Sequence, residues 1–125
     1  MNKAHTKKLY DDFPDLYSER FLSIQESLMP FGFECGDGWF NLIYELSKKI
    51  NKLCPEAKAS QVKEKFGGLR FYVNYCSEKG LNLIHKYEKK SYKICEDCGA
   101  TKEVKIRNFG WIKTLCDGCD KKRRK

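Results

Sequence analysis

The chain has 125 residues, of which 41% are hydrophobic and 14% aromatic, which is enough for one folded domain or a small core with an attached module. No apolar run reaches the length of a membrane span, and a mean hydropathy of −0.68 with 34% charged residues indicates a heavily solvated surface. The formal net charge is +8, from 25 Lys and Arg against 17 Asp and Glu.

The first part of the chain predicts a helix after a polar N-terminus. Residues 1–13 are basic and polar, without the apolar core of a secretion signal, and we expect the first few to fray. Pro14 suits a first helical turn, and the pattern that follows predicts a helix over 15–28, which ends before Pro30. Its apolar stripe consists of Leu16, Phe21, Ile24 and Leu28.

A glycine-rich connector, FGFECGDGW, leads into the most regular helix of the chain. Asp37 is placed to cap that helix, which we predict over residues 39–53. Lysines in its last turns suit the helix dipole, and Pro55 follows its end. The apolar positions at helical spacing are Trp39, Leu42, Ile43, Leu46, Ile50 and Leu53.

The apolar period then changes to two, which predicts a β-hairpin over residues 57–76 with its turn near Gly67 and Gly68. The apolar face of its second strand carries Leu69, Phe71, Val73 and Tyr75. The other face of the hairpin is basic and is a candidate binding surface. It carries Lys63, Lys65, Arg70 and Tyr72.

A third helix is predicted over residues 78–94, with Ser77 as its N-cap and Gly80 weakening its first turn. Its inner side carries Leu81, Ile84, Tyr87 (or Glu88) and Ser91.

Charge is distributed unevenly along the chain. Residues 11–37 hold seven acids and one base, residues 48–70 hold seven bases and two acids, and the chain ends in KKRRK. Such a molecule can present an acidic and a basic face to different partners.

Four of the seven cysteines form two Cys-x2-Cys pairs, Cys95 with Cys98 and Cys116 with Cys119, across a 17-residue spacer. This spacing is typical of a four-thiolate Zn²⁺ site. A dithiol redox motif is the alternative, but it predicts a single pair at a helix start rather than two joined pairs. Four thiolates leave no position for water, so the zinc would be structural, and loading it lowers the net charge to about +6.

The other three cysteines are Cys35, Cys54 and Cys76. None lies beside a histidine that could activate it, so we interpret them as small buried hydrophobic residues. Without a signal sequence, reduced thiols in the cytoplasm are the expectation.

The spacer between the cysteine pairs predicts two short strands around Asn108-Phe109-Gly110, which is the arrangement of a zinc ribbon. Basic residues with an aromatic among them favour nucleic-acid binding through the ribbon and the tail of residues 121–125. The ribbon residues concerned are Lys105, Arg107, Trp111 and Lys113. The preferred alternative is that Trp111 packs between the ribbon and the helices and that the tail is a solvated end.

No catalytic pattern is found in the sequence, so we expect no enzyme and assign no catalytic residue. A metal-dependent nuclease needs an acid two residues before a strand lysine. Here the residue two positions before Lys65 is Lys63, and the residue two positions before Lys63 is Gln61. The glycine pair is not followed by the Lys-Ser/Thr of a phosphate-binding loop.

Three segments, CGDGWFNLIYELS, QVKEKFGGLRFYV and SYKICEDCG with GWIKTLCDGC, resemble in this order a family of small phage, prophage and bacterial zinc-ribbon proteins without an established activity. The resemblance spans about residues 9–121 and implies a phage-type accessory protein, in the host cytoplasm if a phage encodes it. Such proteins commonly bind a host or phage macromolecule, and inhibitors of host defence systems are among them.

The sequence therefore predicts an α+β protein, with helices packed on a β-hairpin in residues 1–94 and a four-cysteine zinc ribbon with a basic tail in 95–125. The expected function is that of a non-catalytic binding module for a protein or nucleoprotein machine. Nucleic-acid binding by the ribbon and tail is the alternative, and no membrane partner is expected.

Overall fold

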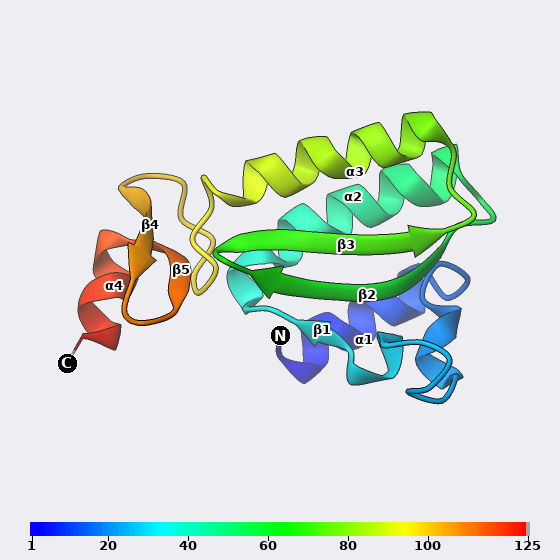
Figure 1. Ribbon diagram of the computed structural model, residues 1–125, viewed down its shortest axis with the longest axis horizontal. Helices are drawn as coiled ribbons and strands as arrows, with labels where there is room; N and C mark the ends of the chain where they lie inside the picture. Colours follow the sequence, from blue (N-terminus) through cyan, green and yellow to red (C-terminus); the bar gives the residue numbers. More distant parts are fainter. Residues whose placement is uncertain (125) are drawn as a thin grey trace.

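The computed structural model describes residues 1–124 and has a mixed α+β architecture, which confirms the predicted class (Figure 1). The α-helices are α1 (Lys3–Asp12), α2 (Phe40–Leu53), α3 (Glu78–Ser91) and α4 (Asp117–Arg123). The strands are β1 (Phe33–Glu34), β2 (Lys58–Lys65), β3 (Gly68–Asn74), β4 (Val104–Asn108) and β5 (Ile112–Cys116). Short 3₁₀ turns are η1 (Ser18–Phe21), η2 (Met29–Phe31) and η3 (Asp37–Trp39).

The larger sheet has the order β1-β2-β3, and β4 pairs with β5 in a separate antiparallel sheet. Figure 1 shows α2 and α3 side by side along the larger sheet, with β4, β5 and α4 at the end opposite to the β3–α3 turn. The predicted hairpin is present as antiparallel β2 and β3. Its two-residue turn places Phe66 at φ 53° and Gly67 at φ 85°, the positive values that a type I′ turn requires.

Helices α2 and α3 confirm two of the predicted helices. On α2 the apolar stripe is buried except for Leu53, which is 41% exposed because it lies in the last turn. On α3 the Ser77 hydroxyl accepts the Gly80 N–H at 3.1 Å, as expected of an N-cap. The helix ends at Ser91 rather than 94, and Leu81, predicted on its inner side, is 40% exposed.

The predicted helix over 15–28 is wrong. The carbonyl of Leu16, which a helix would use internally, accepts the Ala59 N–H at 2.8 Å next to β2. The Arg20 side chain occupies the carbonyls of Pro14 and Tyr17, at 3.1 and 2.7 Å. The only helical part of this segment is the short 3₁₀ turn η1. Three of the four residues of the predicted apolar stripe face solvent. Phe21, Ile24 and Leu28 are 79%, 58% and 42% exposed.

The polar N-terminus, expected to fray, forms α1 instead. The Asn2 side chain accepts the His5 N–H at 2.8 Å and caps the helix. The N-terminal ammonium of Met1 donates to the Cys35 carbonyl at 2.6 Å, and Leu9 is fully buried. Strand β1, in the glycine-rich connector, was also not predicted, and it pairs in parallel with β2.

The hydrophobic core lies between the sheet, α1, α2 and α3. Trp39 is fully buried and donates its indole N–H to the Ile94 carbonyl at 2.9 Å. Tyr17 is also fully buried, and burial raises the pKa of its phenol above the ordinary value. Its hydroxyl is hydrogen bonded to the Ser47 hydroxyl, so neither buried polar group lacks a partner.

In the part of the chain that the structure describes, no helix is both long and apolar enough to cross a membrane.

A first test compares two leucines of α2. Leu46 is fully buried and Leu53 is 41% exposed, so Leu46→Ala should lower the free energy of unfolding by about 2–5 kcal/mol and Leu53→Ala by less than about 1 kcal/mol. Urea denaturation of the two variants measures the difference. Equal losses would contradict the placement of the core.

Candidate metal centre and its junction with the hairpin

The four cysteines of the two pairs come together in the structure. The Sγ atoms of Cys95, Cys98, Cys116 and Cys119 all lie within 4.8 Å of one another, and this group can hold a metal ion. The Sγ atoms of Cys98 and Cys116 are 3.7 Å apart. A tetrahedron with metal–sulfur bonds of about 2.3 Å has edges of about 3.8 Å, so the spacing suits a tetrahedral thiolate site.

The backbone conformation near each Cys-x2-Cys pair brings its sulfurs into the four-cysteine group. In the first pair the chain turns back through Gly99 at φ 82°, and the Gly99 N–H donates to the Cys95 carbonyl at 2.9 Å. The second pair spans the junction of β5 and α4, where Cys116 caps the helix. The Cys119 backbone N–H points at the Cys116 sulfur from 3.4 Å and is the main reason that the pKa of Cys116 falls to about 7. A lowered pKa favours the thiolate form of Cys116, which is the form that binds metal.

The first cysteine pair is fastened to the start of α2 by a close backbone approach. The Gly38 N–H donates to the Glu96 carbonyl at 2.8 Å. A Cβ atom on Gly38 would lie 2.1 Å from the Cys95 carbonyl oxygen, and one on Gly36 would lie 2.4 Å from that of Glu96. Only glycine permits this approach, and the contacts cross the predicted boundary between residues 94 and 95.

A buried ion network links the metal centre to the hairpin. Glu96 accepts the Gly36 N–H at 2.9 Å, and its other carboxylate oxygen lies 3.4 Å from the Lys113 ammonium. Lys113 also donates to Glu64 at 2.8 Å, and Glu64 accepts the Gly67 N–H of the hairpin turn at 2.7 Å. We call Glu96, Lys113 and Glu64 the junction network.

Burial makes the junction network sensitive to loss of a partner. The side chains of Glu96, Glu64 and Lys113 are 4%, 14% and 19% exposed. Burial raises the pKa of Glu96, while Lys113 and the Gly36 N–H act in the opposite direction. A second contact between β5 and the hairpin turn is an uncharged hydrogen bond. The Thr114 hydroxyl donates to the Gly67 carbonyl at 2.6 Å.

Two of the ribbon residues predicted to bind partners are half-buried and paired with carboxylates of the same chain. Lys113 belongs to the junction network, and Arg107, 14% exposed, pairs with Asp117 at 2.6 Å and Asp120 at 3.2 Å. Lys105 and Trp111 do face solvent. Trp111 is 60% exposed, so the alternative that it packs between the ribbon and the helices is wrong.

Part of the basic tail is also paired. Arg123 forms two hydrogen bonds of 2.8 Å with Asp97, and Arg124 lies 2.8 Å from Asp120. Lys121 and Lys122 are exposed, and Lys125 lies outside the described residues.

The predicted basic face of the hairpin is present on the outer side of the sheet. Lys63 and Arg70 stand opposite each other in the β2–β3 register. Lys63 lies over the Tyr72 ring at 6.0 Å, and Lys65 and Tyr72 are exposed. Arg70 is half-buried, with its guanidinium 3.4 Å from the Tyr92 hydroxyl.

An aromatic groove of about 490 Å³ lies where the hairpin turn meets β4 and β5. Its exposed walls include Phe66 at the turn, 64% exposed, and Trp111 between β4 and β5. The ammonium of Lys65 lies 5.6 Å from the centre of the Phe66 ring. Phe66 was not among the predicted binding residues, although an aromatic directly before a Gly-Gly turn is a signal for a side chain presented at a loop tip.

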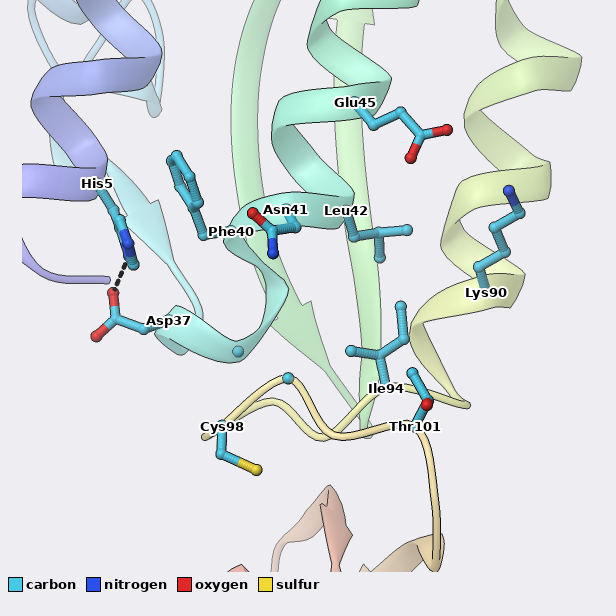
Figure 2. Close-up of a pocket in the computed structure, with 12 residues that line it drawn as sticks. His5, Asp37, Phe40, Asn41, Leu42, Glu45, Lys90, Ile94, Cys98 and Thr101 are labelled. Atoms are coloured by element: carbon cyan, nitrogen blue, oxygen red, sulfur yellow. Dashed lines mark hydrogen bonds and ion pairs between the residues drawn. The ribbon is translucent and has the colours of Figure 1, made fainter.

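A second pocket, of about 550 Å³, opens beside Cys98 between α1, α2 and the first cysteine loop (Figure 2). Figure 2 shows His5 and Asp37 turned toward each other, with Nδ1 3.0 Å from Oδ1, and the His5 ring stacks on Phe40 at 4.0 Å. Asp37 also accepts the Asn2 N–H at 2.7 Å, and these hydrogen bonds lower the pKa of its carboxyl. The pair fastens α1 to the segment before α2, and Asp37 does not cap α2 as predicted.

Comparisons with known proteins do not assign a family: no family model, no curated protein and no solved structure matches this chain. The resemblance to phage zinc-ribbon proteins stays a prediction.

A second test separates the structural lysine from a surface lysine of the same small sheet. Lys113→Met leaves two buried carboxylates without their cation and should lower the free energy of unfolding by about 3–5 kcal/mol. Lys105→Met, at an exposed position of β4, should change it by less than about 0.5 kcal/mol. Urea denaturation of the metal-loaded variants measures both, and an unchanged Lys113→Met protein would show that the junction network is dispensable.

Proposed function

We propose that this protein is a non-catalytic binding module in which a structural Zn²⁺ holds a zinc ribbon, formed by β4 and β5, against the helices and hairpin. Four thiolates at tetrahedral spacing favour zinc or an iron–sulfur cluster among the common metals. Zinc is the better fit because one ion satisfies all four sulfurs and leaves no open position.

A third test addresses this metal. The purified protein should contain one zinc per chain by elemental analysis, and Cys98→Ser should lose it together with cooperative thermal unfolding. Cys98 is exposed, so the substitution itself removes little packing. Cys35→Ser, a cysteine outside the group, is the control that should keep the metal. A Cys98→Ser protein that unfolds at the wild-type temperature without metal, or iron in place of zinc, would contradict the proposal.

The binding surface is proposed to be the aromatic groove, and its occupant an acidic segment of a protein partner. The observation that carries this proposal is the pair of exposed aromatic side chains, Phe66 and Trp111, in one groove beside the junction network. Large aromatic side chains on rigid elements are typical anchors of protein interfaces. The basic residues nearby on the hairpin favour an acidic partner.

The resemblance supplies the context for this proposal. A phage-type accessory protein of this kind would act on a host or phage protein or nucleoprotein machine, such as a host defence system. The groove supports a partner site whether or not the chain is a phage protein.

A fourth test uses matched aromatic variants. The double variant Phe66→Ala and Trp111→Ala should weaken the partner complex by about 30-fold or more, which corresponds to about 2 kcal/mol. Phe21→Ala, at an aromatic in η1 that is even more exposed, is the control that should leave affinity unchanged. The measurement is capture from nuclease-treated host lysate, followed by titration of the identified partner at two salt concentrations. Loss of the partner through Phe21→Ala, with none through the double variant, would place the site elsewhere.

Nucleic-acid binding is the second candidate, favoured by the same exposed aromatics and by Lys65 beside Phe66. Bases stack on such rings at about 1–3 kcal/mol each, and lysines neutralise phosphates. The internal pairing of Arg107 and Lys113 weighs against it, because two of its expected phosphate contacts are occupied. Capture that disappears after nuclease treatment, with a steep salt dependence, would favour this candidate over the protein partner.

A further inference from the structure

Cys54 and Cys76 form a pair of thiols at the end of the molecule opposite to the metal centre. Cys54 ends α2 and Cys76 precedes α3, and their Sγ atoms are 3.2 Å apart. Figure 1 shows this end, where the C-terminus of α2 meets the β3–α3 turn. The sequence interpretation of both residues as inert hydrophobic fillers does not account for two sulfurs in contact.

The fold makes room for both sulfurs with a glycine. A Cβ atom on Gly80 would lie 2.3 Å from the Cys76 sulfur and 2.6 Å from the Cys54 sulfur. Glycine in the first turn of a helix costs about 1 kcal/mol relative to alanine. The close approach of the two sulfurs explains why this position of α3 has no side chain.

The two thiols have different surroundings. Cys54 lies 3.3 Å from the Ser77 hydroxyl; burial acts to raise its pKa, but hydrogen bonds from Ser77 and Cys76 leave that pKa below the ordinary value. Burial and the neighbouring Cys54 raise the pKa of Cys76 to about 12. Cys54 is therefore the thiol that ionises first.

Cys54 opens to a surface pocket, although it is only 7% exposed and Cys76 is half-buried. The lining of this pocket, of about 320 Å³, includes Cys54, Pro55, Glu56, Tyr75 and Ser77. Tyr75, predicted on the apolar face of the hairpin, follows the end of β3 at φ 59°, is 75% exposed and lines this pocket. Cys76 does not line it, so a reagent in the pocket meets Cys54 first.

We propose that Cys54 and Cys76 form a thiol–disulfide exchange site that takes small-molecule disulfides, with Cys54 as the attacking and Cys76 as the resolving thiol. The Cys54 thiolate attacks one sulfur of the small disulfide, forms a mixed disulfide and releases the other half as a thiolate. That thiolate accepts the Cys76 proton, and the Cys76 sulfur then attacks Cys54 and expels the second half. The second half takes up the proton that Cys54 had released.

The two cysteines are thereby oxidised to a disulfide, and the small disulfide is reduced to two thiols. The new bond would tie the end of α2 to the start of α3. In a reducing cytoplasm the pair stays a dithiol until the disulfide pool rises.

The experiment treats the zinc-loaded full chain with bis(hydroxyethyl) disulfide, an uncharged reagent. Peptide mapping without reduction should find a Cys54–Cys76 disulfide while the zinc content stays constant. Because the bond closes a loop across 22 positions, the melting temperature should rise by about 5–10 °C and return on reduction.

Three variants assign the roles. Cys76→Ser should stop at the mixed disulfide on Cys54, because the resolving thiol is missing. Cys54→Ser should form neither product. Cys35→Ser should react at the wild-type rate, since Cys35 lies outside the sulfur pair and burial raises its pKa to about 12. Far-ultraviolet circular dichroism confirms that each variant is folded.

Two results would overturn the proposal. One is oxidation that maps to the four metal-centre cysteines with release of zinc while Cys54 and Cys76 stay reduced. The other is a Cys76→Ser protein that is folded but accumulates no mixed disulfide on Cys54.

Discussion

The buried contact of Glu96 with Lys113 is the constraint on which the arrangement of the two halves depends. A carboxylate that is 4% exposed must find compensating charge and hydrogen bonds, because desolvation of an unpaired ion costs several kcal/mol. Here its partners come from two separate places, the glycine connector and β5, and Lys113 in turn bonds Glu64 of the hairpin. Satisfying this one acid therefore fixes the first cysteine pair relative to the sheet. The metal site needs such a fixed frame, since four sulfurs must converge from two loops.

This constraint also changes what the basic residues of the C-terminal half mean. As a sequence, the ribbon and tail look like a surface for phosphate groups. In the structure the guanidinium of Arg107 and the ammonium of Lys113 are held by carboxylates. Lys65 stays exposed beside Phe66, and Phe66 and Trp111 line one groove. Exposed aromatic contact area with a positive charge beside it is typical of an interface anchor.

How far the sequence predicts this structure depends on which interactions are local. Helix α2 and the hairpin follow from residue periodicity, and the cysteine group from spacing, so all three could be predicted. The helix over 15–28 could not be rejected, because its carbonyls are taken by Ala59 and by the Arg20 side chain, contacts that periodicity does not encode. Helix α1 could not be predicted either, because it carries few buried apolar residues and depends on the cap at Asn2. The partners of Lys113 are distant in sequence, so its structural role could not be predicted from the sequence.

Distance within the fold also allows two kinds of thiol chemistry in one small chain. A thiolate bound to a metal donates its charge to that metal and is a poorer nucleophile for disulfides than a free one. The Cys54–Cys76 pair lies outside the four-cysteine group, at the opposite end of the sheet (Figure 1). An oxidant that reaches the pocket beside Cys54 can therefore be consumed there without opening the metal centre. Gly80 lies against the sulfur pair as Gly36 and Gly38 lie against the first cysteine pair. At each of these positions a Cβ atom would collide with the neighbouring segment.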